Sequence, residues 1–228
     1  MKDQYFYLLI NLFSLSYPLF KSFDKRVNYY LKWKALFFGI LFSGSIFIIW
    51  DVIFTNLGIW KFNPQYILGY YIINLPVEEW IFFIAIPFSS MFIYECYNYF
   101  VKKDILEKIS THITFFLIIF LMVVGLLNTD KLYTSVTFIF TSITLLIHYI
   151  IFKNRLIGRF LMSYLIILIP FLIVNGLLTS LPVLIYNDLE NLSIRIYTIP
   201  IEDTVYGFLM ILLNLSVYEP LKKKWNIQ

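Results

Sequence analysis

Pro76-Val77-Glu78-Glu79-Trp80 begins an apolar stretch that reaches Glu95, and Pro200-Ile201-Glu202-Asp203 begins a second that reaches Glu219. The two blocks are offset by 124 residues. Carboxylates that bracket a membrane-length apolar segment are costly, and they mark functional positions. The sequence therefore contains a duplicated acidic frame. The same offset relates two further pairs of identical residues, Asn63 with Asn187 and Tyr94 with Tyr218.

The composition indicates a membrane protein. Hydrophobic residues make up 60% of the chain and charged residues 14%, whereas about a quarter of the residues of a soluble domain are charged. Seven apolar segments are long enough to span about 30 Å of hydrocarbon. We therefore expect an all-α integral membrane protein with seven transmembrane helices, near 5–20, 35–54, 77–96, 112–128, 133–152, 160–182 and 204–219.

Lysines and arginines are distributed unevenly among the predicted loops. Of the 18 cations, fourteen fall in the first, third and fifth loops and the C-terminal tail, which leaves four elsewhere. Cytoplasmic loops carry the excess of positive charge, so we expect the N-terminus outside and the C-terminus inside. Topology accounts for the net charge of +4, which gives no reason to expect nucleic acid as a partner.

The offset of 124 residues predicts how the helices are organised. A shift by 124 residues aligns the first three predicted helices with the last three. We therefore expect two three-helix repeats, 1–104 and 129–228, joined by a linker helix in 105–128. An odd number of crossings between them makes the repeats parallel. Packing about a pseudo-twofold axis would bring Glu78, Glu79, Glu202 and Asp203 to one central cavity near the outer side.

The acidic motifs also have a purely structural interpretation. Proline followed by acidic residues is an ordinary helix start, because the helix dipole favours carboxylates there. Two adjacent acids that recur beside the membrane favour function. The candidate catalytic residues are thus Glu78, Glu79, Glu202 and Asp203. The supporting candidates are Asp51 with its offset partner Asn175, Arg195, and Glu95 and Glu219 near the inner face. Arg195 is either an ion-pair partner of Glu202 or Asp203 or a solvated loop residue.

Other residue types give no separate site. A single cysteine, Cys96, and two distant histidines, His112 and His148, show no metal-ligand spacing. We expect both histidines near the inner interface. Aromatic residues crowd the predicted outer boundary, as in an aromatic belt, and an inward orientation of some of them stays open: Trp50, Trp60, Trp80, Tyr66, Tyr70 and Tyr71. No glycine-rich dinucleotide fingerprint is present, so neither a metal nor another cofactor is expected.

The two acidic blocks, together with the segment from Asp51 to Trp60 and Ile194-Arg195-Ile196, resemble the small membrane lycopene cyclases. This family includes heterodimeric pairs of three-helix proteins, single fused chains and a domain of fungal fusions with phytoene synthase. The chain is similar to the fused bacterial or archaeal form over essentially its whole length. The resemblance implies a location in the cytoplasmic membrane, among membrane lipids.

The resemblance implies an isomerase that converts the acyclic ends of lycopene to β rings, giving β-carotene through the one-ring γ-carotene. The acidic residues suit this reaction, which needs an acid, a base and exclusion of water. A partly desolvated carboxyl group beside another carboxylate has a raised pKa and serves as a general acid. Nearby carboxylates and aromatic rings stabilise a carbocation. No net redox change occurs, so the stoichiometry requires no cofactor.

Several alternatives stay open from the sequence. The acidic motifs do not decide between β and ε rings, one-ring and two-ring products, or lycopene and longer carotenoids. They also leave open which carboxylate is the acid and which is the base, whether a loosely bound activator is needed, and the oligomeric state. A proton-coupled transporter with parallel repeats is a rival, although acids at helix ends favour the cyclase. A retinal protein is rejected because no predicted span contains a lysine. An intramembrane protease is improbable, because Phe83 stands where its motif needs arginine.

Overall fold

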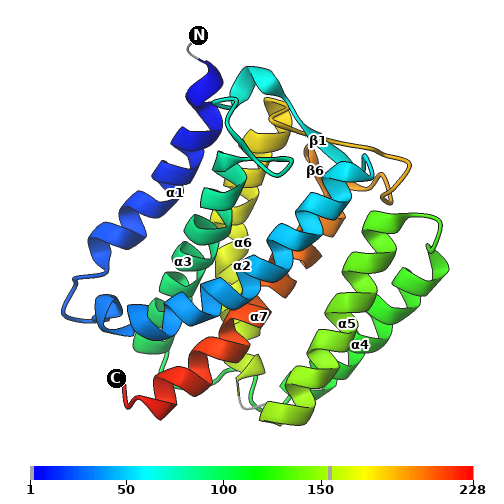
Figure 1. Cartoon of the computed structure of the whole chain (residues 1–228). Helices are drawn as coiled ribbons and strands as arrows, with labels where there is room; N and C mark the ends of the chain where they lie inside the picture. The colour runs from blue at the N-terminus through cyan, green and yellow to red at the C-terminus, as the bar shows by residue number, and fades with distance from the viewer. Residues whose placement is uncertain (1–2, 154–155, 228) are drawn as a thin grey trace.

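The computed structural model describes residues 3–153 and 156–227, so that Lys2 and Arg155, two of the cations counted above, lie outside it. The chain folds into a bundle with the N-terminus and C-terminus at opposite ends (Figure 1). Within the described residues the α-helices are α1 (Phe6–Lys21), α2 (Trp33–Asn56), α3 (Val77–Phe100), α4 (Ser110–Leu127), α5 (Leu132–Phe152), α6 (Ile157–Ser180) and α7 (Ile201–Lys224).

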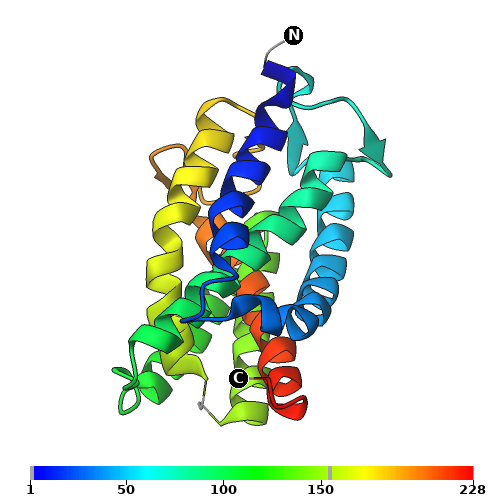
Figure 2. The ribbon, with the colours of Figure 1, turned by 90° about the vertical axis from the view of Figure 1, so that its left-hand side faces the viewer.

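Six of these helices, α2 to α7, are long and apolar enough to cross a membrane. The first, α1, has 16 residues and is shorter than the roughly 20 residues that a span requires. It lies along α3 (Figure 2), where the side-chain amide of Asn11 donates a 2.8 Å hydrogen bond to the carbonyl of Glu78. The predicted all-helical membrane architecture is therefore confirmed, with six rather than seven helices of spanning length among the described residues.

The two halves repeat the same elements at the offset of 124 residues. The bounds of α2 and α6, and those of α3 and α7, differ by that number. So do three short strands in each half, β1 (Trp60–Phe62), β2 (Tyr71–Ile72) and β3 (Leu75–Pro76) against β4 (Leu184–Tyr186), β5 (Arg195–Ile196) and β6 (Ile199–Pro200). The hairpins β2–β3 and β5–β6 each have a residue with positive φ in the turn, Ile73 at 62° and Tyr197 at 59°.

Strands β1 and β4 join the halves in an antiparallel ladder. Its central pair is Lys61 with Ile185, two positions that are themselves 124 residues apart. The flanking hydrogen bonds are also exchanged by the offset, since Asn63 N–H donates to Val183 at 2.9 Å and Asn187 N–H donates to Ile59 at 2.8 Å. A local twofold axis therefore passes through this ladder.

Helix packing places four helix ends beneath the ladder. Helix α2 packs on α7, α3 on α6, α1 on α3 and α5 on α7, while α4 packs mainly on α5 at one side of the bundle (Figure 1). The starts of α3 and α7 and the ends of α2 and α6 consequently meet at the end of the bundle that carries the strands. A core cluster rich in aromatic side chains fills this region.

Candidate active site

The first acid of each duplicated pair holds the loop that precedes its helix. Glu78 Oε1 accepts the N–H of Leu68 at 2.6 Å, and Glu202 Oε1 accepts the N–H of Leu192 at 2.7 Å. Both contacts recur at the offset of 124 residues. Glu202 also accepts the Thr134 hydroxyl at 2.6 Å. These buried acids therefore fix the loops against the starts of α3 and α7, and neither belongs to the lining of the central cavity described below.

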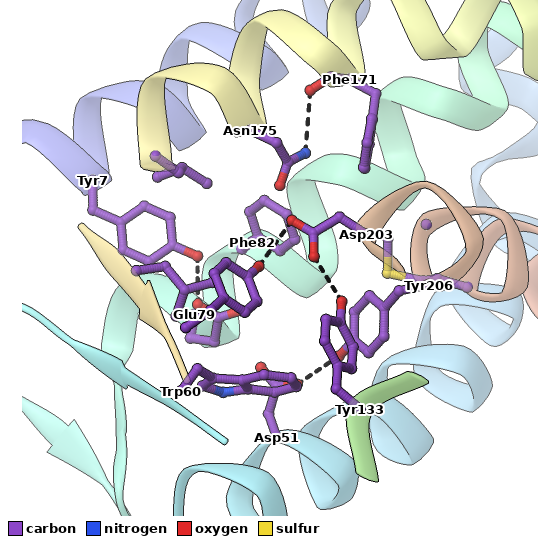
Figure 3. A pocket seen from close by; sticks show the side chains of 15 residues that line it. Tyr7, Asp51, Trp60, Glu79, Phe82, Tyr133, Phe171, Asn175, Asp203 and Tyr206 are labelled. Carbon is purple, nitrogen blue, oxygen red and sulfur yellow. Dashed lines mark hydrogen bonds between the residues drawn. The ribbon is translucent and has the colours of Figure 1, made fainter. Parts of the chain in front are cut away.

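The second acid of the first pair belongs to a cluster of two carboxyl groups and two phenols. Glu79 on α3 accepts the Tyr7 hydroxyl at 2.5 Å, and Asp51 on α2 accepts the Tyr206 hydroxyl at 2.5 Å (Figure 3). The carboxyl groups of Asp51 and Glu79 lie within hydrogen-bonding reach of each other. Such a contact needs a proton on one of the two groups, because carboxylates only accept.

The second acid of the other pair has a different environment. Asp203 on α7 accepts the Tyr133 hydroxyl at 2.7 Å and the Tyr186 hydroxyl at 2.8 Å, one on each carboxylate oxygen (Figure 3). Tyr186 lies on β4, outside the helices, and burial together with the neighbouring Asp203 raises the pKa of its phenol. The phenol therefore stays protonated and remains a donor, so that two hydrogen bonds stabilise a negative charge on Asp203.

A cavity of about 40 Å³ separates the two acidic clusters. This volume is room for a few water molecules. Several residues that line the cavity are related in pairs by the local twofold axis. The two members of each pair differ in residue type, so the polar groups of the cavity are not arranged symmetrically. The repeat-related pairs that line it are Asp51 with Asn175, Glu79 with Asp203, Phe82 with Tyr206, and Trp60 with Leu184.

Aromatic rings surround the carboxylates. The indole of Trp60 contacts the ring of Tyr133 edge-on at 5.2 Å between centroids, and Tyr133 stacks on Tyr186 at 5.8 Å. Tyr206 is edge-on to Trp50 at 5.5 Å. The faces and ring electrons of such side chains stabilise a cation in a desolvated site. Trp50 and Trp60 are both buried, so these two residues face the interior of the bundle.

The supporting candidates divide between the two ends of the bundle. Asn175 lines the cavity, and its amide donates to the Phe171 carbonyl at 3.1 Å. Arg195 instead bonds Asp188 and the Thr198 carbonyl, the latter at 2.6 Å. Its predicted ion pair with Glu202 or Asp203 is not among the described ion pairs, because Asp188 within the same loop is nearer.

Glu95 and Glu219 lie toward the other end of their helices, away from the cavity. Glu95 is bonded by Lys32 at 2.5 Å, Lys222 at 2.7 Å and Tyr218 at 2.8 Å, and Glu219 shares Lys222 at 2.6 Å. This buried ion cluster joins α3 and α7 to Lys32, the residue directly before α2. His148, which was predicted near the inner interface, lies in the last turns of α5, is buried and bonds Ser216 at 2.9 Å.

The sequence analysis missed the tyrosines that bond the two acidic clusters. Tyr206 and Tyr186 were detectable, since the repeat places Phe82 and Phe62 at the equivalent positions and only one half carries the hydroxyl. Tyr7 and Tyr133 are 126 residues apart rather than 124, so a comparison of the two repeats does not pair them. No cluster of histidine, cysteine, aspartate or glutamate suited to a metal ion occurs among the described residues.

Comparison with known proteins gives one match. A family model described as lycopene cyclase matches residues 4–97 and 130–221, which is more than half of the chain. The two matched stretches contain the two acidic frames and omit α4. No curated protein and no solved structure matches the chain.

Proposed function

The chain belongs to the lycopene cyclase family, a membership that implies a cyclase acting on a carotenoid within a membrane, and we propose that it closes β rings on lycopene by acid and base catalysis. The observation that carries this proposal is the pair of dissimilar buried acidic clusters, Asp51–Glu79 and Asp203, on opposite sides of one aromatic cavity. An acid and a base in a site that excludes water are what the reaction requires.

The Asp51–Glu79 pair is the proposed proton donor. Two carboxyl groups within hydrogen-bonding reach share a proton between them, and one of the pair is then a general acid. Transfer of that proton to the terminal double bond of an acyclic end produces a tertiary carbocation. The phenols of Tyr7 and Tyr206 remain as donors to the carboxylates and stabilise the charge that the acid acquires.

No protein group reacts in the ring-closing step, in which the protein only surrounds the cation and stabilises it. The neighbouring double bond of the substrate attacks the cation, a carbon–carbon bond forms and the positive charge moves onto a ring carbon. Trp60 and Tyr206 border the cavity in which this charge develops, and their ring electrons stabilise it. The end group is larger than the cavity, so its entry displaces side chains of the lining.

Asp203 is the proposed base. It accepts the proton lost from the ring, which leaves a ring double bond and returns the substrate to neutrality, so the reaction is an isomerisation. Its carboxylate accepts hydrogen bonds from two phenols, and its described side-chain hydrogen-bond partners include no carboxyl group, which favours the charged form before the step. The β ring is the product that the resemblance of the whole chain to the family implies, and the chromatography described next distinguishes it from an ε ring.

Expression in lycopene-producing cells tests the proposal, with pigments separated by chromatography. We expect wild-type protein to yield β-carotene. Glu79→Gln and Asp203→Asn should each lower ring formation by roughly 10²-fold to 10⁴-fold at wild-type protein levels in the membrane. Glu219→Gln is the matched control, because it changes a carboxylate at the other end of the bundle. Full ring formation by the first two variants would overturn the acid–base assignment, and an ε product would overturn the ring type.

The orientation in the membrane is part of the proposal. We propose that the end with the strands faces out and that the end with the C-terminus faces the cytoplasm of a bacterial or archaeal cell, with 1–104 and 129–228 as repeats around a linker in 105–128. The excess of lysine and arginine in the loops at the C-terminal end supports this. A reporter fused to the C-terminus that is active only in the cytoplasm tests it, and an inactive but stable fusion would reverse the orientation.

A further inference from the structure

A second cavity opens from the side of the bundle between α1, α3 and α6. Its volume is about 330 Å³, and it shares Phe171 and Asn175 with the lining of the central cavity. On α6 it extends from Asn175 to Ile167, eight residues that rise roughly 12 Å. We refer to it as the α3–α6 groove. At Phe171 and Asn175 this lateral opening adjoins the central cavity that holds the acidic clusters.

The α3–α6 groove is suited to an apolar chain. Its serines direct their hydroxyls to backbone carbonyls, as Ser14 does to Ile10 at 2.8 Å, Ser16 to Phe13 at 2.8 Å and Ser89 to Ala85 at 2.7 Å. The remaining wall is largely aliphatic and aromatic, and it carries no charged side chain. A polar ligand would find few free hydrogen-bond partners there, whereas a hydrocarbon chain has no hydrogen bonds to lose.

The repeat-related helix pair is closed. A Cβ added to Gly39 on α2 would lie 2.7 Å from the Asn214 side chain on α7, so these two helices are already in close contact. The open pair instead has a proline within each helix, Pro87 in α3 and Pro170 in α6, and proline bends a helix. Their repeat-related positions in α7 and α2 are isoleucines, Ile211 and Ile46.

Another lateral groove, between α2 and α3, is larger but separate. Its volume is about 490 Å³, and none of the residues that line it also lines the central cavity. Trp80 and Phe83 belong to its wall. Size alone would favour this groove, but the two lining residues shared with the central cavity favour the α3–α6 groove.

We propose that the α3–α6 groove binds the polyene chain of the acyclic carotenoid while one end group reacts in the central cavity. This inference rests on the proposed function and adds the route and the stoichiometry of binding. Because the related helix pair is closed at Gly39, we take the α3–α6 groove as the lateral entrance to the acidic clusters. One end group therefore reacts per binding event, and a two-ring product requires the one-ring intermediate to leave and re-enter with its other end first.

The local twofold axis supplies a matched pair of variants for the test. Ile173 lines the α3–α6 groove and is 59% exposed, and its repeat-related residue Ile49 is 61% exposed and lines neither groove. Ile84 is a further control that lines the α2–α3 groove. We expect Ile173→Trp to lower ring formation from lycopene roughly tenfold by obstructing the groove, and Ile49→Trp and Ile84→Trp to leave it close to wild type.

The measurements are pigment chromatography and protein level in the membrane. Equal activity of Ile173→Trp and Ile49→Trp would overturn the inference and mean that lipid chains fill the groove. Loss of activity in Ile84→Trp alone would assign the entrance to α2–α3. If wild type forms no rings at all, the proposed function fails instead. A photo-crosslinking residue at 173 gives a second readout, since it should attach to lycopene in a Glu79→Gln background while the same residue at 49 does not.

Discussion

Adjacent glutamates in the first acidic pair should respond differently to the same substitution. Glu78 accepts the N–H of Leu68 at 2.6 Å from its place at the start of α3, and Glu79 faces the cavity. In Glu78→Gln the amide oxygen still accepts that N–H, so the variant loses only the difference between a charged and a neutral acceptor. That difference is about 1 kcal/mol of unfolding free energy.

Glu79→Gln changes chemistry rather than the loop. Its amide oxygen still accepts the Tyr7 hydroxyl, but the side chain has no acidic proton. We expect ring formation to fall by roughly 10²-fold to 10⁴-fold with little change in thermal stability. Glu78→Gln should show the converse, with a lower melting temperature and activity per folded molecule close to wild type.

The assay pairs thermal unfolding of detergent-solubilised protein with pigment analysis of lycopene-producing cells. Glu202→Gln repeats the loop test in the second half, where Leu192 is the donor, and should behave as Glu78→Gln does. If Glu78→Gln abolishes ring formation while its melting temperature stays at the wild-type value, the division between a loop-holding acid and a reacting acid is wrong.

Four further outcomes are expected. Tyr206→Phe removes the donor to Asp51 and should lower ring formation by roughly tenfold or more, since hydrogen bonds to charged groups contribute about 1.5–3 kcal/mol; unchanged activity would exclude this contact from the reaction. Gly39→Ala should destabilise the protein by about 1–3 kcal/mol, because its Cβ meets Asn214. Thermal unfolding checks this against Gly44→Ala on the same helix, where the added Cβ would lie in ordinary contact, 3.7 Å from the Phe83 carbonyl. Glu95→Gln should lower the free energy of unfolding by about 3–5 kcal/mol, because Lys32 and Lys222 lose their buried partner. Adding Lys32→Met to this variant should restore part of that free energy. Ile73→Gly should raise the melting temperature, since a left-handed residue with a Cβ costs about 1–2 kcal/mol, and a lower value would contradict the turn geometry.

Much of the fold was predictable because it depends on signals that are local or repeated. Apolar runs located the helices to within a few residues, and the offset between Pro76 and Pro200 anticipated elements that recur in both halves. Helix α1 was predicted as a span over 5–20, and it forms over nearly the same 16 residues, which is fewer than the roughly 20 that a span requires. A run of hydropathy does not distinguish a spanning helix from a shorter one packed on a neighbour.

The candidate site was predictable only in part. The sequence located the acids but did not distinguish Glu78 from Glu79, because successive residues on a helix point in directions about 100° apart and the loop contact of Glu78 is tertiary. Trp60 reaches the cavity because β1 pairs with β4 across the bundle. Three-residue strands leave little signal, and pairing between distant segments leaves none.

The ladder between β1 and β4 has a consequence for the ancestry of this chain. Because Lys61 and Ile185 face each other at repeat-related positions, the same contacts would be self-complementary in a dimer of two identical half-length chains. Such a dimer would have to carry every cavity residue twice. Gene fusion removes that obligation, and it lets one copy hold aspartate where the other holds asparagine, as at Asp51 and Asn175, or a phenol where the other holds phenylalanine. Broken symmetry is how a duplicated scaffold acquires a donor on one side and an acceptor on the other.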